Sequence, residues 1–125
     1  MLKIKSYVKV NSIEEAYELN QKKTAIVLGG MVWLKMGNRN ISTAIDLSGL
    51  GLAGIQETDE EFVIGCMTTL RELETDKRLN EYTQGAVRES VRHIVGVQFR
   101  NCATVGGSIW GRYGFSDVLT MFLGM

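Results

Sequence analysis

The stretch QFRNCATVGGSI at residues 98–109 carries most of what the sequence predicts. Its glycine pair, Gly106-Gly107, lies between the hydroxyl side chains of Thr104 and Ser108. Glycine lets a backbone approach a ligand closely, and oriented amide groups in such a turn can bind a phosphate. The carboxylate of Asp117 follows, and it can accept hydrogen bonds from the sugar hydroxyls of a nucleotide. The alternative is a tight turn followed by a last helix whose first turn Asp117 stabilises.

A second glycine pair stands in AIVLGGMVWL, residues 25–34. An apolar run ends at Leu28 and is followed by Gly29-Gly30, which predicts a buried strand that leads through a turn into a helix. Such a turn leaves several amide N–H groups without partners, and these can bind an anion. The Lys-Ser/Thr pair of a nucleoside-triphosphate loop is absent. A purely structural turn between strand and helix is the alternative.

Residues 49–54, GLGLAG, spell the G-x-G-x-x-G pattern of dinucleotide-binding folds. That fingerprint requires a helix that begins at the turn, because the first amides of the helix hold the pyrophosphate. Here the segment that follows predicts a hairpin, in which residues 53–56 and 62–65 flank the acidic turn 57–61. We therefore interpret residues 49–54 as a plain turn.

The remaining elements follow from hydrophobic periodicity and capping residues. Ser12 with Glu15, and Thr69 with Glu72, have the spacing of a capping box. We expect strands at 3–10, 24–28 and 42–47, helices at 12–22, 31–36, 69–73, 80–95 and 117–125, and β-prone chain at 97–111. Val87, Val91 and Ile94 are expected on the inner face of the helix at 80–95.

Composition excludes several classes of function. The chain has 125 residues, 45% of them hydrophobic, with 14 basic and 14 acidic side chains. A zero net charge argues against a nucleic-acid-binding protein, and no apolar run is long enough to span a membrane. Two cysteines, Cys66 and Cys102, are too few for an iron–sulfur cluster or a zinc site, so we expect no metal, buried thiols and a cytoplasmic location.

Taken together and in order, these segments resemble the FAD-binding subunit of molybdenum hydroxylases, the xanthine dehydrogenase and carbon monoxide dehydrogenase group. That family carries a motif like hhGGGTDL, then IDLS, a hairpin and IGAxTT, then QIRNxATVGGNI and a later S-D. The corresponding segments here are residues 28–34, 45–48, 64–69, 98–109 and 116–117.

The resemblance implies an α+β fold, the FAD-binding domain of the molybdopterin dehydrogenase type. Residues 1–55 would form the first FAD-binding subdomain and 56–125 the start of the second, which the family continues beyond this length. It also implies that FAD receives electrons from [2Fe–2S] clusters and passes them to NAD or another acceptor. The partners would be a [2Fe–2S] subunit, a molybdopterin-binding subunit and the missing C-terminal part of the flavin subunit.

By the same resemblance, one segment from each subdomain holds the pyrophosphate, and Asp117 holds a ribityl or ribose hydroxyl. Ile94 falls where a side chain near the flavin ring is expected. No catalytic side chain is required, because the flavin carries the redox chemistry. The candidate cofactor residues are Val27, Leu28, Gly29, Gly30, Met31, Val32, Trp33 and Leu34, then Thr104, Val105, Gly106, Gly107, Ser108 and Asp117.

The zero net charge of the chain suggests how these segments could bind the two negative charges of a pyrophosphate. We expect free backbone amides at both glycine pairs to do so, with only Arg100 and Arg112 nearby. The acidic side chains at 72, 74 and 76 alternate with basic ones and predict an exposed surface of mixed charge. Trp110, Tyr113 and Phe115 are expected to form an exposed apolar patch that favours self-association.

The first motif departs from the family at three positions. Met31, Val32 and Trp33 replace its third glycine, its threonine and its acidic residue. Bulky side chains are poorly suited to a turn position with positive φ. One alternative is therefore a remnant that keeps the fold and binds partners without FAD. Another is a regulatory domain that binds a different phosphate-bearing ligand at Gly106-Gly107.

Overall fold

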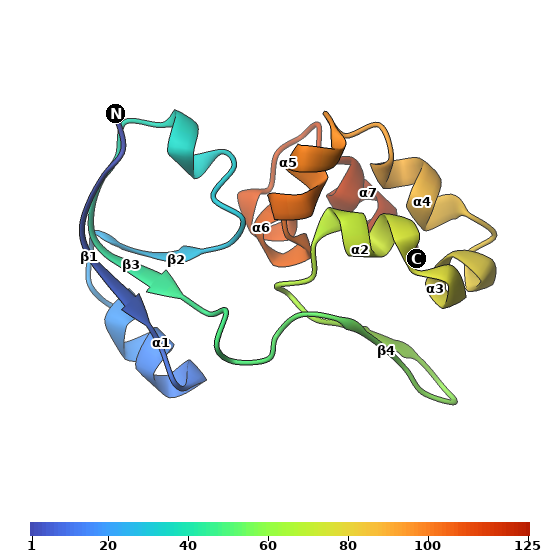
Figure 1. Ribbon diagram of the computed structural model, residues 1–125, viewed down its shortest axis with the longest axis horizontal. Coiled ribbons are helices and arrows are strands. Elements are labelled where there is room, and N and C mark those ends of the chain that lie inside the picture. Colours follow the sequence, from blue (N-terminus) through green and yellow to red (C-terminus); the bar gives the residue numbers. More distant parts are fainter. The chain divides into compact units, whose positions relative to one another are not determined.

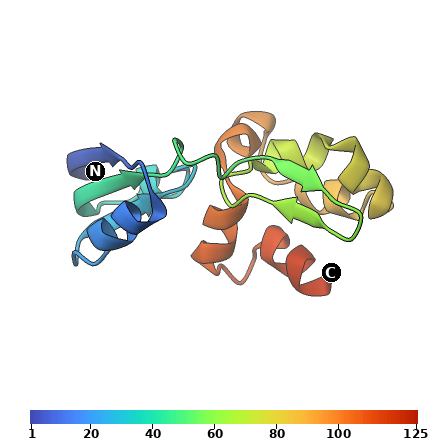
Figure 2. The ribbon, with the colours of Figure 1, turned by 90° about the horizontal axis from the view of Figure 1, so that it is seen from below.

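The computed structural model describes residues 1–125, which divide into two compact units at 1–52 and 53–125. Figures 1 and 2 show a sheet with helical segments in the first unit, and a hairpin with short helices in the second. We call these units 1 and 2 and describe each separately. The mixed helix-and-strand fold class predicted from the sequence is confirmed.

Unit 1 is built on a parallel sheet. Its strands are β1 (Lys3–Lys9), β2 (Ala25–Leu28) and β3 (Asn40–Asp46), in the order β1-β3-β2. The central strand β3 is the most buried because it has a neighbour on each side. In the edge strand β2 only Leu28 is buried, while Ala25 and Ile26 are half-buried and Val27 is exposed, whereas the sequence predicted a buried strand.

The helix α1 (Ile13–Asn20) covers one side of this sheet. It begins where predicted because the Ser12 hydroxyl accepts a hydrogen bond from the Glu15 amide (3.1 Å). Ala16 of α1 packs with Val10 and Ile45 in one core cluster. A second cluster of Leu28, Ile41, Ala44 and the half-buried side chains around them forms the rest of the core of unit 1.

Between β2 and β3 the predicted helix at 31–36 is shortened to one turn of 3₁₀-helix, η1 (Leu34–Met36). The reason is Met31, whose φ of 61° lies in the left-handed region. A residue in that conformation cannot belong to a right-handed helix, so the helical turn starts only after it.

Unit 2 begins with the predicted hairpin of β4 (Ile55–Glu57) and β5 (Phe62–Ile64), which are antiparallel. Thr58 closes its tip, since its hydroxyl accepts hydrogen bonds from the amides of Glu60 and Glu61. The predicted helix at Thr69 is also present as α2 (Leu70–Thr75), with a complete capping box between Thr69 and Glu72.

The single helix predicted at 80–95 is wrong. Two helices, α3 (Lys77–Tyr82) and α4 (Ala86–Val91), are separated by a turn in which Gln84 and Gly85 have φ of 52° and 82°. Asn80 stabilises the break because its side-chain oxygen accepts a hydrogen bond from the Arg88 amide (2.8 Å). Val87 and Val91 are buried as predicted, whereas Ile94 is half-buried and lies beyond the helix.

The β-prone interpretation of residues 97–111 is wrong as well. This segment forms the helices α5 (Val97–Cys102) and α6 (Val105–Gly111), and the last predicted helix is present as α7 (Asp117–Gly124). Thr104 begins α6, since its hydroxyl accepts a hydrogen bond from the Gly107 amide (3.2 Å). The pair Gly106-Gly107 therefore lies in the first turn of a helix and not in a tight turn.

Candidate functional site

The first glycine segment follows the carboxyl end of β2. The amides of Gly29, Gly30, Met31 and Val32 donate to no acceptor within the chain. Met31 has left-handed backbone (φ 61°), and Trp33, two residues further on, is right-handed (φ −75°, ψ −35°). Successive unpaired amides around such a change of handedness can form a concave anion-binding surface. This segment therefore has the free N–H donors of an anion-binding surface.

The backbone conformation of Met31 is unfavourable, but its side-chain packing is favourable. A left-handed conformation costs a residue with a side chain about 1–2 kcal/mol. Its half-buried side chain packs against the cluster of Leu28, Ile41 and Ala44, which offsets part of that cost. The conformation that exposes the amides is therefore maintained by packing although no glycine occupies the position.

The second glycine segment differs from the first. The amides of Val105 and Gly106 donate to the carbonyl oxygens of Thr68 (2.9 Å) and Cys66 (2.7 Å). The Gly107 amide donates to the Thr104 hydroxyl. The expectation of free amides at this glycine pair is therefore wrong, because the start of α6 is hydrogen-bonded to residues 66–68.

Close packing explains Gly106 instead. A Cβ atom there would lie 2.7 Å from the Cys66 carbonyl oxygen and 2.9 Å from the Cys66 Cβ. Gly107 is exposed, and the Ser108 side chain beside it is half-buried without a partner in the chain. In this segment only the exposed surface of Gly107 and the Ser108 hydroxyl are therefore available to contact a phosphate.

Asp117 lies in the first turn of α7, where the Ser116 hydroxyl caps the helix through the Leu119 amide (3.1 Å). Its side chain is exposed and has no partner in the chain. The carboxylate is therefore free to accept hydrogen bonds from hydroxyl groups. The sequence alternative, in which Asp117 stabilises the first turn of the helix, agrees with the same position.

The two arginines expected near the phosphates have different environments. Arg100 is only 5% exposed and binds Glu74, so it cannot reach a ligand at the surface. Arg112 is exposed, at the left-handed end of α6. Arg100, which we expected near the phosphates, therefore stabilises unit 2 through Glu74 and is not available to a ligand.

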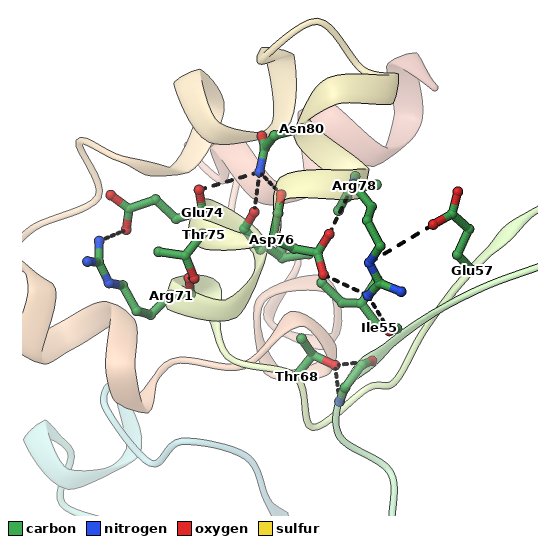
Figure 3. Close-up of polar contacts among 12 residues, drawn as sticks. Ile55, Glu57, Thr68, Arg71, Glu74, Thr75, Asp76, Arg78 and Asn80 are labelled. Atoms are coloured by element: carbon green, nitrogen blue, oxygen red, sulfur yellow. Dashed lines mark hydrogen bonds and ion pairs between the residues drawn. The ribbon is translucent and has the colours of Figure 1, made fainter.

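Figure 3 shows the polar network of unit 2 in which Glu74 and Asp76 take part. Glu74 binds Arg71 and Arg100, while Asp76 binds Arg78 and accepts a hydrogen bond from the Leu79 amide (2.9 Å). The expectation of an exposed mixed-charge surface is therefore wrong for these two carboxylates. No local pattern could have indicated this burial, because Glu74 and Arg100 are 26 positions apart.

These contacts predict how the stability of unit 2 depends on pH. Hydrogen bonds from Arg100 hold the pKa of Glu74 below its ordinary value, against the opposing effect of burial. A lowered native pKa adds stability that is complete above the unfolded pKa and is lost as the pH falls through the native one. We expect the free energy of unfolding to fall below about pH 5, and to fall less in Glu74→Gln. Urea unfolding between about pH 6 and pH 3 measures this; equal slopes in both proteins would contradict it.

The cysteines and aromatic residues complete the candidate groups. Cys66 and Cys102 are free and exposed, so the expectation that they pack in the core is wrong. Trp110 is 81% exposed, and Phe115 and Tyr113 stack on each other with ring centroids 5.2 Å apart. No group of three or more His, Cys, Asp or Glu side chains is arranged to hold a metal ion. No helix has the length and apolar character needed to cross a membrane.

The family described as the FAD-binding domain in molybdopterin dehydrogenase matches residues 2–125. The chain belongs to this family. No curated protein matches it. In this family the cofactor is FAD, and the open amides after β2 are of the kind that its pyrophosphate requires. The second segment fits less well, since its amides are already used.

Solved structures show the same fold. A chain of the cyanide-inactivated Cu,Mo-CO dehydrogenase is 27% identical with a TM-score of 0.78, over 89% of this chain and 41% of that one. A chain of reconstituted CO dehydrogenase from Oligotropha carboxidovorans is 26% identical with a TM-score of 0.70, over 86% and 39%. Quinoline 2-oxidoreductase from Pseudomonas putida 86, 20% identical with a TM-score of 0.70 over 87% and 39%, shares the fold. The chain thus spans about two fifths of the length of these relatives.

Proposed function

We propose that this chain is the N-terminal, FAD-binding part of an electron-transfer subunit of a molybdenum hydroxylase such as xanthine dehydrogenase. The observation that carries the proposal is the row of unpartnered amides at Gly29–Val32, within a chain that matches the family over residues 2–125. Electrons would arrive from [2Fe–2S] clusters and leave to NAD or another acceptor. Residues 1–55 and 56–125 would be the two FAD-binding subdomains of the proposal.

In this proposal Val27–Leu34 binds the pyrophosphate through backbone N–H groups. The segment 104–108 contributes the Ser108 hydroxyl and the exposed surface of Gly107, and Asp117 accepts a hydrogen bond from a ribityl or ribose hydroxyl. FAD, when bound, supplies the redox chemistry, because its flavin ring accepts and releases electrons. The chain's own residues bind and orient it.

The partners in this proposal are a [2Fe–2S] subunit, a molybdopterin-binding subunit and the C-terminal part of the flavin subunit. One of the similar structures is a Cu,Mo-CO dehydrogenase, which supports partners of this kind. The exposed Trp110 and Phe115 support a further association, with a second copy or with additional polypeptide. Both thiols are free, which supports a reducing, cytoplasmic location.

A titration of the 125-residue chain with FAD tests the proposal. We expect FAD to bind and ADP to compete with it, whereas riboflavin, which has no phosphate, does not bind measurably. Replacing Gly30 by valine adds a branched side chain within the segment of open amides, and the φ of Gly30 is not positive, so the change does not force a side chain into the left-handed region. We expect Gly30→Val to weaken FAD binding by about tenfold or more, equivalent to about 1.4 kcal/mol.

Gly114→Ala is the matched control, because Gly114 lies outside both segments and a Cβ there meets nothing within 4 Å. It should bind FAD as the wild type does. Wild-type protein that binds no FAD, or binds riboflavin as well as FAD, contradicts the proposal.

The second candidate function is a partner-binding remnant that no longer binds FAD. The observation in its favour is the left-handed Met31, followed by Val32 and Trp33 where the family has Thr and Asp. In that case the chain should bind no FAD, and the triple variant Met31→Gly, Val32→Thr, Trp33→Asp should recover binding. Binding by the wild type rules this alternative out.

A further inference from the structure

Arg100 is the only charged residue among the buried residues of the chain. It lies on α5, within the stretch 98–109 that identified the family. A buried guanidinium group is costly unless every side of it is paired. The partners of Arg100 therefore show what this residue maintains.

Its guanidinium group binds two separate segments. Nε lies 2.8 Å from Glu74 Oε2 and Nη2 lies 3.3 Å from Glu74 Oε1, a two-point contact with α2. Nη1 donates to the carbonyl oxygen of Ile94 (3.2 Å), in the connection between α4 and α5. A planar fork of this kind fixes orientation as well as distance.

The connection that Arg100 binds is strained. Val95, the next residue after Ile94, has φ of 51° and is 77% exposed. Left-handed backbone is a true outlier for a β-branched residue, and it persists only where the surroundings determine it fully. The bond from Arg100 to the Ile94 carbonyl supplies one of those determinants.

After the C-terminal end of α5, backbone hydrogen bonds join residues 103–106 to residues 66–70. Leu70 donates to the carbonyl of Ala103 (2.9 Å), Val105 to that of Thr68 (2.9 Å) and Gly106 to that of Cys66 (2.7 Å). The Arg100–Glu74 pair lies about one helical turn from this junction in both α5 and α2. It thus makes a second attachment between the two helices.

We propose that Arg100 and Glu74 are positioning residues for FAD: they hold α5 on α2 so that the segment 104–108 and the carbonyl of Ile94 keep their places. This inference rests on the proposed function for its ligand, but the arrangement it describes exists without FAD. The pair acts through the backbone and touches no phosphate.

Arg71 provides a matched control. Its Nη1 lies 2.9 Å from the same Glu74 Oε2, but its side chain is 39% exposed and binds neither the Ile94 connection nor α5. Arg71→Met and Arg100→Met each remove one cation from one carboxylate. Only Arg100→Met also removes the hydrogen bonds that attach α5 to Glu74 and to the Ile94 carbonyl.

Because Arg100→Met alone could fail to fold, a second variant is needed. Replacing both members of a buried ion pair by apolar residues is often neutral or stabilising. We therefore include Arg100→Met with Glu74→Leu, in which α2 and α5 can still pack. Apolar contact is non-directional, so this double variant keeps the packing without the orientation that the fork imposes.

The experiment measures amide hydrogen exchange of Val105 and Gly106 in the 125-residue chain without FAD, and then the affinity for FAD by titration. We expect both amides to exchange about tenfold faster or more in the double variant, and FAD to bind about tenfold more weakly. In Arg71→Met both quantities should stay within about twofold of the wild type.

A double variant that is folded, with unchanged exchange at Val105 and Gly106 and unchanged FAD affinity, overturns the inference and leaves Arg100 a merely structural residue. Equal effects of Arg71→Met and Arg100→Met overturn it too. If the wild type binds no FAD, the proposed function fails, while faster exchange in the double variant alone still supports the positioning of the segment.

Discussion

Replacing Gly106 by alanine is expected to destabilise unit 2 by about 2–3 kcal/mol, at the upper end of the cost of inserting a methyl group into close packing. The added Cβ would lie 2.7 Å from the carbonyl oxygen of Cys66 and 2.9 Å from its Cβ. These are atoms of the main chain or directly attached to it, so no side-chain rotation relieves the contact. The hydrogen bond from the Gly106 amide to the same oxygen (2.7 Å) must lengthen as α6 moves away.

Urea unfolding of Gly106→Ala against Gly114→Ala measures this effect. A Cβ at Gly114 meets nothing within 4 Å and its φ is not positive, so we expect a change within about 0.5 kcal/mol there. Gly107→Ala should fall between the two, because its Cβ would meet only the hydroxyl of Thr104, at 2.9 Å. Equal unfolding curves for Gly106→Ala and Gly114→Ala would show that residues 66–68 do not restrict this position.

The second large effect is expected at Thr68, which is completely buried. Its hydroxyl accepts a hydrogen bond from the Gly54 amide and donates one to the Gly54 carbonyl, both at 2.9 Å (Figure 3). Valine has almost the same shape but leaves the Gly54 amide without a partner, and the Gly54 carbonyl keeps only its hydrogen bond from the Gly65 amide (3.0 Å). Since one unpaired group of this kind costs about 1–3 kcal/mol, we expect Thr68→Val to lower the free energy of unfolding by about 1–3 kcal/mol.

The variant Thr68→Ser distinguishes the contribution of the Thr68 hydroxyl to stability from that of its methyl group. Serine keeps both hydrogen bonds and loses one methyl group, so its cost should be about 1 kcal/mol. Amide hydrogen exchange of β4 and β5 should accelerate in the valine variant, because Gly54 lies directly before the hairpin. A valine variant as stable as the serine variant would mean that the two hydrogen bonds contribute no net stability.

Local signals in the sequence predicted the elements whose causes are local. Ser12 with Glu15 and Thr69 with Glu72 place hydroxyl and carboxylate three residues apart, and both helices begin there. The hairpin followed from two apolar runs around an acidic turn. In each case the residues that decide the structure are neighbours in the chain.

The errors arise where distant residues decide. The break between α3 and α4 depends on Asn80, which binds the Arg88 amide eight positions away. The glycine pair 106–107 lowers the intrinsic helix propensity of its segment, yet α6 forms because Thr104 caps it and Cys66 and Thr68 bind its first amides. The burial of Arg100 depends on Glu74 across 26 positions.

The candidate site divides in the same way. Unpaired amides after β2 were predictable, because a strand that ends at two glycines leaves them without acceptors. The second segment also contains a glycine pair, but its environment differs, since Gly106 packs closely against Cys66. A glycine that serves a ligand and a glycine that serves packing are alike in the sequence, and only the tertiary contacts separate them.

The most direct measurement is an amide NMR spectrum of the uniformly ¹⁵N-labelled chain during titration with FAD. We expect the resonances of Gly29, Gly30, Met31 and Val32 to shift most in unit 1, because their free N–H groups acquire phosphate acceptors. ADP should reproduce those shifts, and riboflavin should not. FAD binding that leaves these four resonances in place would contradict the central claim that the open amides after β2 hold the pyrophosphate.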